Sequence, residues 1–221
     1  MGGTLSIARN WEDGTVNAYA SRSGDTWNVA MFGGLARHAT ITADGFALVV
    51  CHEIGHHIGG APKKGGWFGN KWASNEGQSD YFATLKCLRK TFRNENNVEI
   101  VGNMNVPTAV VTSCAEQFSS NEDQLICQRG AMAGLSTAKL FQDLRSQTTA
   151  PDFTTPDANV VTRTSHSHPA TQCRLDTYFS GALCNIDDNI DVDQKDEAVG
   201  VCYKASGDTT GLRPNCWFKA E

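Results

Sequence analysis

Residues 52–56 read His-Glu-Ile-Gly-His, and no other feature limits the fold of this 221-residue chain as strongly. Residues four apart share one face of an α-helix, so His52 and His56 can direct two imidazoles at one metal ion. Glu53 follows the first histidine and is close enough to face the same ion without binding it. This is the arrangement of a zinc site whose coordinated water has a carboxylate base beside it. The pattern therefore predicts a helix here and a third ligand from elsewhere in the chain.

The segment Asn75–Asp80, one loop downstream, offers that third ligand. Glu76 comes twenty residues after His56, at the start of a second predicted helix, so a helix–loop–helix hairpin can bring its carboxylate to the same ion. Asp80 is one helical turn further on and can accept the Nδ1 proton of a ligating histidine, which fixes the tautomer of that ring. We therefore expect two imidazoles, one carboxylate and an open position for water.

Several histidine and aromatic residues near the pentad of residues 52–56 are expected to pack rather than to bind the metal. His57 lies about 100° round the helix from His56, which favours a surface or packed histidine. The loop over 61–72 carries Trp67, Phe68 and Trp72. Aromatic side chains on such a loop can line a cleft, but ordinary packing is the favoured interpretation.

The remaining sequence contains strand patterns near its start and helical patterns after them. β-forming residues cluster on both sides of a Ser23–Asp25 turn, which predicts a hairpin. The predicted elements are strands at 16–20 and 27–32, a helix from Thr42 or Asp44 through His57 that ends at Gly59–Gly60, a helix from near Ser74 to about Arg89, and a helical region over 107–146 with breaks near Ser119 and Gly130. A capping-box-like Ser120-x-x-Asp123 pattern lies inside the last region.

The composition changes near residue 148. Residues 148–167 are rich in Thr, Pro and Asp, as in a loop or linker. The last fifty residues hold four cysteines and show little periodicity. We expect residues 1–147 to form the core that holds the metal site. We expect residues 148–221 to form a linker and a Cys-rich segment that packs on the same domain.

The eight cysteines bear on the cellular compartment. Their number is even and high for this length, and none lies in a Cys-x-x-Cys pair. Disulfides in an oxidising compartment are therefore favoured over a cytosolic protein with inert thiols, and the chain is expected to be secreted or periplasmic. The expected pairs in the C-terminal segment are the neighbours Cys173–Cys184 and Cys202–Cys216. The opening residues Met1–Ser6 lack the basic and apolar regions of a signal peptide, so none is expected in this sequence.

Charge and hydropathy exclude several classes of partner. The net charge is −5 and the nineteen Lys and Arg residues are scattered, which does not favour nucleic acid or an anionic membrane surface as a partner. The longest apolar run, Phe46–Cys51, is too short to cross a bilayer, so no transmembrane span is expected. The sequence gives no indication of an oligomeric state.

Other patterns are weaker. The acidic segment 187–193 resembles a calcium loop, but it lacks glycine at its sixth position and has Ala198, not glutamate, at its twelfth, so a solvated acidic loop is favoured. No Gly-x-Ser-x-Gly sequence is present. Cys51 precedes His52 directly, and because adjacent helical side chains diverge, a Cys-His protease is disfavoured.

The two motifs together resemble those of the gluzincin metallopeptidases, thermolysin among them. The order of Val16-Asn-Ala-Tyr-Ala, a strand ending in Gly33-Gly34-Leu35, and the run from Leu48 through the pentad is similar to the HtpX and CAAX-prenyl endopeptidase group. That group also carries a Ser/Thr-His-Pro motif with a following Arg, which resembles Ser167-His168-Pro169 and Arg174. The resemblance covers residues 16–89 well and 166–179 loosely.

The resemblance implies a role for each residue of the two main motifs. His52, His56 and Glu76 would bind Zn²⁺, and Glu53 would be the general base. Asp80 would be the partner of His52 behind the ligands, and its neighbour in the motif, Asn75, would also support the ligand shell.

The resemblance also implies a substrate strand and a further histidine. The strand around Asn17 and Ala18 would bind the backbone of a polypeptide substrate as an added β-strand. His168 would approach the metal, either as a transition-state donor or as an inhibitory ligand. A loop histidine without either role is an equal alternative. The chain departs from many members of the group in having no membrane span, and in having Ser79 where alanine is usual.

We therefore expect an α+β, zincin-like fold with a small N-terminal sheet on the active-site helix, a mainly helical lobe and a disulfide-braced C-terminal segment. The expected activity is that of a zinc-dependent endopeptidase. The alternative is a latent or non-catalytic zinc-containing binding or assembly module of the cell envelope. Glu53 argues against the non-catalytic form of this alternative, because a purely structural zinc site has no use for that carboxylate.

Overall fold

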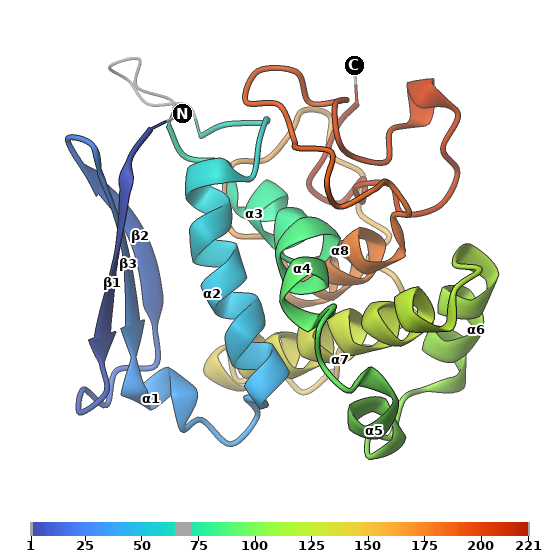
Figure 1. Ribbon diagram of the computed structural model, residues 1–221, viewed down its shortest axis with the longest axis horizontal. Coiled ribbons are helices and arrows are strands. Elements are labelled where there is room, and N and C mark those ends of the chain that lie inside the picture. The colour runs from blue at the N-terminus through green and yellow to red at the C-terminus, as the bar shows by residue number, and fades with distance from the viewer. Residues whose placement is uncertain (1, 65–71, 221) are drawn as a thin grey trace.

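A small β-sheet and a larger set of helices make up this α+β protein (Figure 1). The computed structural model describes residues 2–64 and 72–220. The sheet contains β1 (Thr4–Asn10), β2 (Ala18–Ser23) and β3 (Thr26–Phe32) in the order β1-β3-β2. β1 runs parallel to β3 and β2 runs antiparallel to it, so β2 is an edge strand among the described residues.

The hairpin of β2 and β3 confirms the one predicted from the sequence. Ser23 pairs with Thr26, which leaves Gly24 and Asp25 as a two-residue turn. Gly24 has a φ of 56°, a conformation that such turns require and that glycine adopts without steric cost. Val29, at the centre of β3, is buried with side chains of the neighbouring helix, so one face of the sheet is covered.

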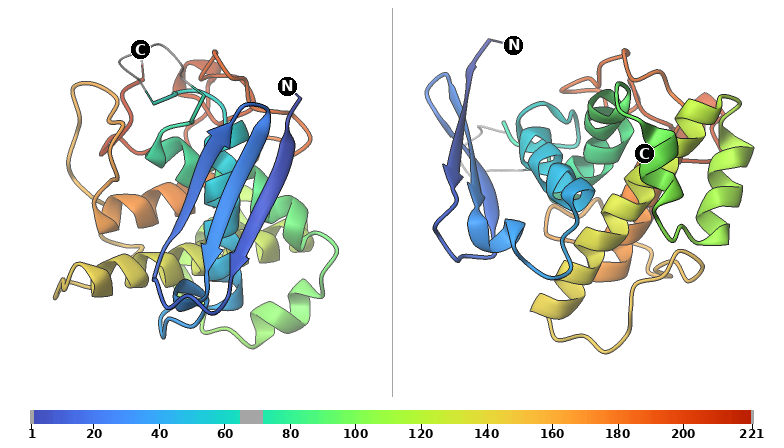
Figure 2. Two further views of the ribbon diagram at one scale, coloured as in Figure 1. Left: turned by 90° about the vertical axis from the view of Figure 1, so that its left-hand side faces the viewer. Right: turned by 60° about the horizontal axis from the view of Figure 1, so that its bottom comes forward.

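α2 (Ala43–Ile58) carries the pentad and packs against β2 and β3, and Figure 2 shows the sheet as a layer beside it. The hydroxyl of Thr42 caps the helix by accepting a hydrogen bond from the Gly45 amide at 3.0 Å. The helix ends at Gly59, and Gly60 follows with a φ of 84°, which turns the chain toward the next segment. Both ends confirm the predicted boundaries.

The next helical stretch contains a π-helical insert. α3 (Glu76–Phe82) begins at Asn75, whose side chain accepts a hydrogen bond from the Gln78 amide at 2.8 Å. η1 (Ala83–Cys87) has π geometry, and α4 (Leu88–Phe92) completes the stretch. The helix predicted from near Ser74 to about Arg89 is therefore confirmed, although its apolar stripe does not reveal the π turn.

The other helices are α1 (Gly33–Ala36), α5 (Asn97–Gly102), α6 (Thr108–Gln117), α7 (Asn121–Leu144), α8 (Thr171–Leu183) and the 3₁₀ turn η2 (Lys204–Ser206). α7 packs on α2 and α8 packs on α7, whereas α1 contacts β3 beside the sheet (Figure 1). The predicted break near Ser119 lies between α6 and α7, where the Ser120 hydroxyl accepts a hydrogen bond from the Asp123 amide at 3.0 Å.

The predicted break near Gly130 is wrong, because α7 continues through it to Leu144. Glycine at this position and at Gly134 serves helix packing instead. A Cβ at Gly134 would lie 2.6 Å from the Cβ of Tyr178 on α8, and a Cβ at Gly130 would lie 3.4 Å from the Cβ of Ala182. Glycine costs a helix about 1 kcal/mol relative to alanine, and the close approach of α8 offsets that cost.

α8 lies in the C-terminal region, where the sequence shows little periodicity. Its buried face mixes Cys173, Arg174, Thr177 and Gly181 with apolar residues. Because polar and small side chains occupy this face, the usual apolar repeat of a helix is weak here. The polar members find their partners on other elements, which the local sequence does not show.

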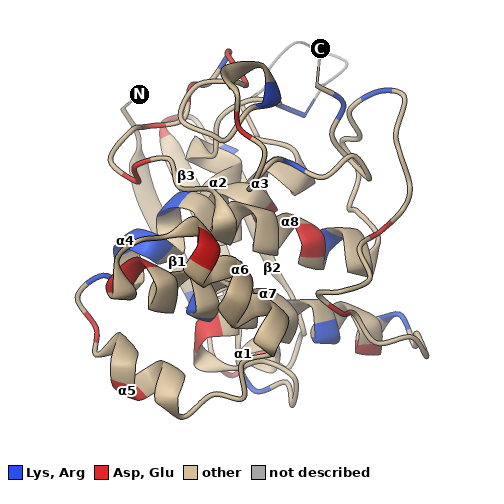
Figure 3. Cartoon of the chain, turned by 90° about the vertical axis from the view of Figure 1, so that its right-hand side faces the viewer, with Lys and Arg blue, Asp and Glu red and all other residues tan. Residues whose placement is uncertain are grey.

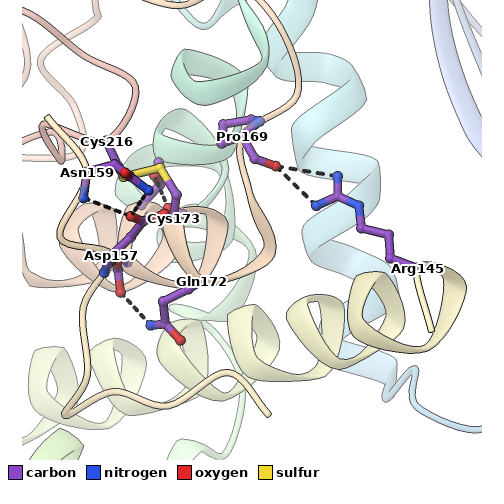
Figure 4. Close-up of a disulfide and its surroundings, with 9 residues drawn as sticks. Arg145, Asp157, Asn159, Pro169, Gln172, Cys173 and Cys216 are labelled. Atoms are coloured by element: carbon purple, nitrogen blue, oxygen red, sulfur yellow. Dashed lines mark hydrogen bonds between the residues drawn. A yellow bond between two sulfur atoms is a disulfide. The ribbon is translucent and has the colours of Figure 1, made fainter. Parts of the chain in front are cut away.

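Four disulfides join all eight cysteines: Cys51–Cys87, Cys114–Cys127, Cys173–Cys216 and Cys184–Cys202. The expected neighbour pairs Cys173–Cys184 and Cys202–Cys216 are therefore wrong. Cys173 and Cys184 lie at opposite ends of α8, about 16 Å apart at the helical rise, whereas a disulfide needs Cα atoms within about 7 Å. Cys173 instead binds Cys216 in the C-terminal segment (Figure 4).

Within the described part of the chain, no helix combines the length and the apolar character that crossing a membrane requires. The four disulfides fit an oxidising, exported compartment. α8 packs on α7 and α3. The division at residue 148 stays a prediction.

Candidate metal centre

Three buried ligand atoms meet between α2 and α3. His52 and His56 are one turn apart on α2, and Glu76 is the first residue of α3. Glu76 Oε2 lies 3.3 Å from His52 Nε2 and 3.6 Å from His56 Nε2. The ligand atoms of the three residues lie within 4.8 Å of one another, and all three residues are buried. The structure thus brings together the three predicted ligands.

The spacing of these atoms fits a metal ion. Tetrahedral bonds of about 2.0–2.2 Å separate neighbouring ligand atoms by about 3.3–3.6 Å, which is the range between Glu76 Oε2 and the two imidazoles. The same oxygen is buried, and no hydrogen bond of good geometry reaches it from the described residues, although imidazole nitrogens lie 3.2–3.6 Å away. A buried carboxylate oxygen is unfavourable unless positive charge faces it. The residues present therefore fit an ion held by two nitrogens and one oxygen.

The other nitrogen of each imidazole faces an acceptor. His56 Nδ1 lies 2.9 Å from the carbonyl oxygen of Ser74 and 3.0 Å from the hydroxyl of Ser79. His52 Nδ1 lies 2.6 Å from Asp80 Oδ1. A proton on each Nδ1 leaves each Nε2 lone pair directed at the site, as metal binding requires. Asp80 thus lies where the sequence predicts it, and Ser79 is more than a neutral replacement for alanine.

Arg174 of α8 lies behind Asp80. Its Nη2 donates a hydrogen bond to Asp80 Oδ1 at 2.6 Å, and both side chains are buried. The guanidinium also lies 4.0 Å from the ring centroid of Phe141 on α7. Arg174 therefore fixes the carboxylate that in turn orients His52. The sequence places Arg174 only in the motif of the resembled group and indicates no such contact.

The pKa values of the ligands reflect burial and their mutual charges. Burial, together with the charge of His52, lowers the pKa of His56 to about 3. Burial acts in the same direction on His52, but Asp80 and Glu76 outweigh it and raise the pKa of His52 to about 10. Burial favours the neutral acid of Glu76, but interaction with His52 and Lys64 holds its pKa well below the ordinary value. A divalent ion would displace the Nε2 proton of His52.

Glu53 lies beside the three ligands without joining them. Its side chain is buried, and it is outside the group of mutually close ligand atoms. Burial raises the pKa of Glu53, and the charge of His52 opposes that shift. Glu53 also lines the two cavities that flank the site. This is the position expected of a base that faces the metal without binding it.

A cleft separates the metal centre from the edge of the sheet. It has a volume of about 460 Å³ and is lined by residues 17–20, including the predicted Asn17 and Ala18, and by the three ligand residues. A smaller cavity of about 120 Å³ lies beside Glu53 and is lined by apolar side chains such as Leu140 and by polar ones such as Thr137. The predicted substrate strand therefore faces the predicted ligands across an open space.

The remaining predicted residues are His168, in the loop before α8, and Asn75, which caps α3 and contacts that loop. His168 Nε2 lies 3.2 Å from Glu76 Oε2, and the His168 side chain is 63% exposed. It is not a member of the group of three mutually close ligands. Asn75 Nδ2 donates a hydrogen bond to the Ser165 carbonyl at 2.9 Å, which ties α3 to this loop. Arg145 donates to the carbonyl oxygen of Pro169, as Figure 4 shows.

One contact of the site was not expected. Lys64 forms an ion pair with Glu76 Oε1, so the two oxygens of this carboxylate have different surroundings. Nothing in the sequence around Lys64 signals this contact.

His57 and Trp72 pack as the sequence predicts. The His57 ring lies between those of Trp27 and Trp72, with ring centroids 5.5 and 5.1 Å away. The loop aromatics Trp67 and Phe68 lie outside the described residues.

Comparisons of the chain with models of protein families, with curated proteins and with solved structures find no match. The group of His52, His56 and Glu76 does not by itself assign a family. What the site does is therefore inferred from its own geometry and chemistry.

Proposed function

We propose that this chain is a zinc-dependent endopeptidase with a zincin-like fold, related to the gluzincins and to the HtpX and CAAX-prenyl endopeptidase group. The observation that carries the proposal is the convergence of two imidazoles and one carboxylate beside a separate buried carboxylate, Glu53. Two histidines and one glutamate form a donor set of catalytic zinc sites, which keep a fourth position open.

Zinc at this position would polarise a peptide carbonyl and lower the pKa of a coordinated water to about 7. Glu53 accepts a proton from the attacking water and passes it to the leaving amide nitrogen. Asp80 holds the proton on His52 Nδ1, and Arg174 holds Asp80 in place. His56 is held in the same way by the Ser74 carbonyl. These contacts keep both rings oriented without help from the substrate.

The substrate class follows from the edge strand. Residues 17–20 line the cleft, and β2 has no partner on that side among the described residues. An extended polypeptide can pair with such an edge through its backbone. Pairing of this kind does not require a chain terminus, which favours cleavage within a chain. The small cavity beside Glu53 offers space for one side chain next to the scissile bond.

Metal analysis combined with cleavage of an unbiased peptide library tests the proposal. We expect one zinc per chain, and cleavage that a chelator abolishes and added zinc restores. A His56→Ala variant should lose both zinc and cleavage, whereas His38→Ala, on a histidine outside the site, should lose neither. Zinc at one per chain without any cleavage would refute the proposed activity.

A second candidate function rests on one contact. His168 Nε2 approaches the same Glu76 oxygen that faces the two ligating histidines, and Lys64 pairs with the other oxygen. Such a centre can be latent, or it can be a non-catalytic zinc site of a binding or assembly module. A His168→Ala variant separates the candidates. Higher turnover than wild type supports latency, and lower turnover supports His168 as a donor to the transition state.

A further inference from the structure

A second hollow continues from the metal cleft along the edge of the sheet. Residues 17–20 line the cleft, and Arg22, further along β2, lines a groove of about 1620 Å³. Trp72 lines both hollows. On the opposite wall, Ser167 lines the groove and the next residue, His168, lines the cleft. The groove is larger than the roughly 1,000 Å³ upper range of small-molecule pockets, so an extended ligand fits it better.

The groove gathers positive charge. Five cationic side chains line it against one carboxylate, that of Glu197: Arg22, Lys63, Arg163, Lys195 and Lys219. The whole chain has a net charge of −5, so this balance is local. The five cations are scattered along the sequence, and only the fold brings them together. Figure 3 shows Lys and Arg on the long loops beside the C-terminus.

Most of these cations form no close ion pair among the described residues. Arg163, Lys195 and Lys219 are exposed and form no ion pair within residues 2–64 and 72–220, although the charge of Lys195 acts on nearby Asp193. Lys63 is half-buried, and among the described residues its ammonium donates to neutral acceptors, which include the Trp72 carbonyl at 3.3 Å and the Ser74 hydroxyl at 3.2 Å. Burial lowers the pKa of Lys63 to about 8. A half-buried ammonium gains most when an anionic group approaches it.

We propose that this groove binds an acidic segment of the polypeptide substrate, and that the enzyme thereby selects chains with carboxylates a few residues from the scissile bond. This selection among substrates rests on the proposed peptidase function. At about 3.3 Å per residue, β2 spans roughly 13 Å from Ala18 to Arg22. A chain paired with this edge at the metal cleft therefore enters the groove about four residues later.

A polypeptide fits the groove better than a nucleic acid. Nonspecific single-strand binding relies on several aromatic rings that stack on bases. Trp72 is the one Phe, Tyr or Trp among the described residues that line the groove, and its ring contacts His57 and Arg22. The edge of β2 offers backbone groups, which pair with a peptide.

Binding to the inactive Glu53→Gln variant tests the groove separately from cleavage. Two labelled peptides of equal length are used, one with a run of glutamates and one with glutamines in their place. The groove variant carries Arg163→Gln, Lys195→Gln and Lys219→Gln. The control carries Arg9→Gln, Lys90→Gln and Lys139→Gln, which are also exposed and change the net charge equally.

We expect the groove variant to bind the acidic peptide about tenfold more weakly than the control does, with an affinity that falls as salt rises. The glutamine peptide should bind weakly to both. Equal affinities of the two variants, or of the two peptides, would overturn the proposal. Tighter, groove-dependent binding of a single-stranded oligonucleotide would also overturn it. Charge-dependent peptide binding without cleavage by the wild type would instead refute only the peptidase function.

Discussion

Asp80 connects the metal centre to the rest of the molecule. Its Oδ1 lies 2.6 Å from both His52 Nδ1 and Arg174 Nη2, and the residue is fully buried. A buried carboxylate between two cationic groups stays ionised, and the pKa of Asp80 is accordingly lowered although burial opposes that shift. The orientation of His52, one of the three proposed ligands, therefore depends on Arg174 of α8, which is outside that group.

We predict that Asp80→Asn weakens zinc binding by about 10- to 100-fold. The neutral amide oxygen accepts the hydrogen bond from His52 Nδ1 more weakly than the carboxylate does, so it orients the ring less firmly. Competition with a chromophoric chelator measures this affinity. Asp176→Asn is the matched control, since Asp176 of α8 is likewise a helical aspartate that accepts hydrogen bonds, from the Asp157 amide and from Gln172. Equal zinc affinities for the two variants would contradict the role of Asp80.

A buried lysine predicts a pH dependence of stability. Burial lowers the pKa of Lys86 to about 8, and its ammonium donates to the Asp187 carbonyl at 2.7 Å. Between pH 8 and the usual lysine pKa of about 10.4, the unfolded chain binds more protons than the folded one. The free energy of unfolding therefore rises with pH, by about 1 kcal/mol up to pH 9.5. Urea unfolding of Lys86→Met should lack this part of the rise, and an identical slope would count against it.

Close helix contacts set the geometry of the site. Gly55 is the fourth residue of the pentad, and a Cβ there would lie 3.2 Å from the Cα of Ser79 on α3. Glycine thus lets α3 approach α2 closely enough for Glu76 to meet both histidines. Gly134 plays the corresponding part between α7 and α8. Because α8 carries Arg174, the second contact also bears on Asp80.

Two glycines of α7 provide a paired prediction. Gly134→Ala should lower the free energy of unfolding by about 1–3 kcal/mol, because its Cβ would lie 2.6 Å from that of Tyr178. Gly130→Ala should leave stability unchanged or raise it by up to about 1 kcal/mol, because the nearest atom, Ala182 Cβ, is 3.4 Å away. Urea denaturation compares them, and a loss of stability in both variants would contradict this account of the α7–α8 contact.

The elements near the metal centre could be predicted because their signals are local. Thr42 and Asn75 each cap a helix by accepting a hydrogen bond from the amide three residues further along the chain. Gly24 adopts the positive φ that the hairpin turn requires at its position. The disulfide partners and α8 could not be predicted, because their signals depend on contacts between distant segments. Arg174 is an example, since its partner Asp80 is 94 residues away. Lys64 lacks any local signal for its contact with Glu76.

At the scale of the whole molecule, the C-terminal segment supports the wall of the site. The Ser165 amide donates to the Trp217 carbonyl at 2.7 Å, and the Val161 amide donates to the Asn215 carbonyl at 2.9 Å. The Cys173–Cys216 disulfide fixes the same segment to α8. The loop that carries His168 and one wall of the groove is therefore held between α8 and the end of the chain.

The disulfides predict a difference in stability that follows from loop length. The Cys173–Cys216 disulfide joins residues that are 43 positions apart in the sequence, whereas Cys114–Cys127 joins residues that are 13 positions apart. Replacing the first pair by alanines should cost about 1 kcal/mol more than replacing the second, because the longer loop restricts the unfolded chain more strongly. Guanidinium unfolding of the two double variants measures the difference. A larger loss for the shorter loop would show that other effects dominate.

The central claim is that Glu53 acts as a base beside a zinc ion held by His52, His56 and Glu76. The most direct measurement is kcat/KM for one cleaved peptide, compared between wild type and Glu53→Gln, with zinc content determined on the same samples. The account predicts one zinc per chain in both proteins and a loss of at least about 100-fold in the variant, as for the removal of a general base. Unchanged turnover in a zinc-loaded Glu53→Gln variant would contradict it.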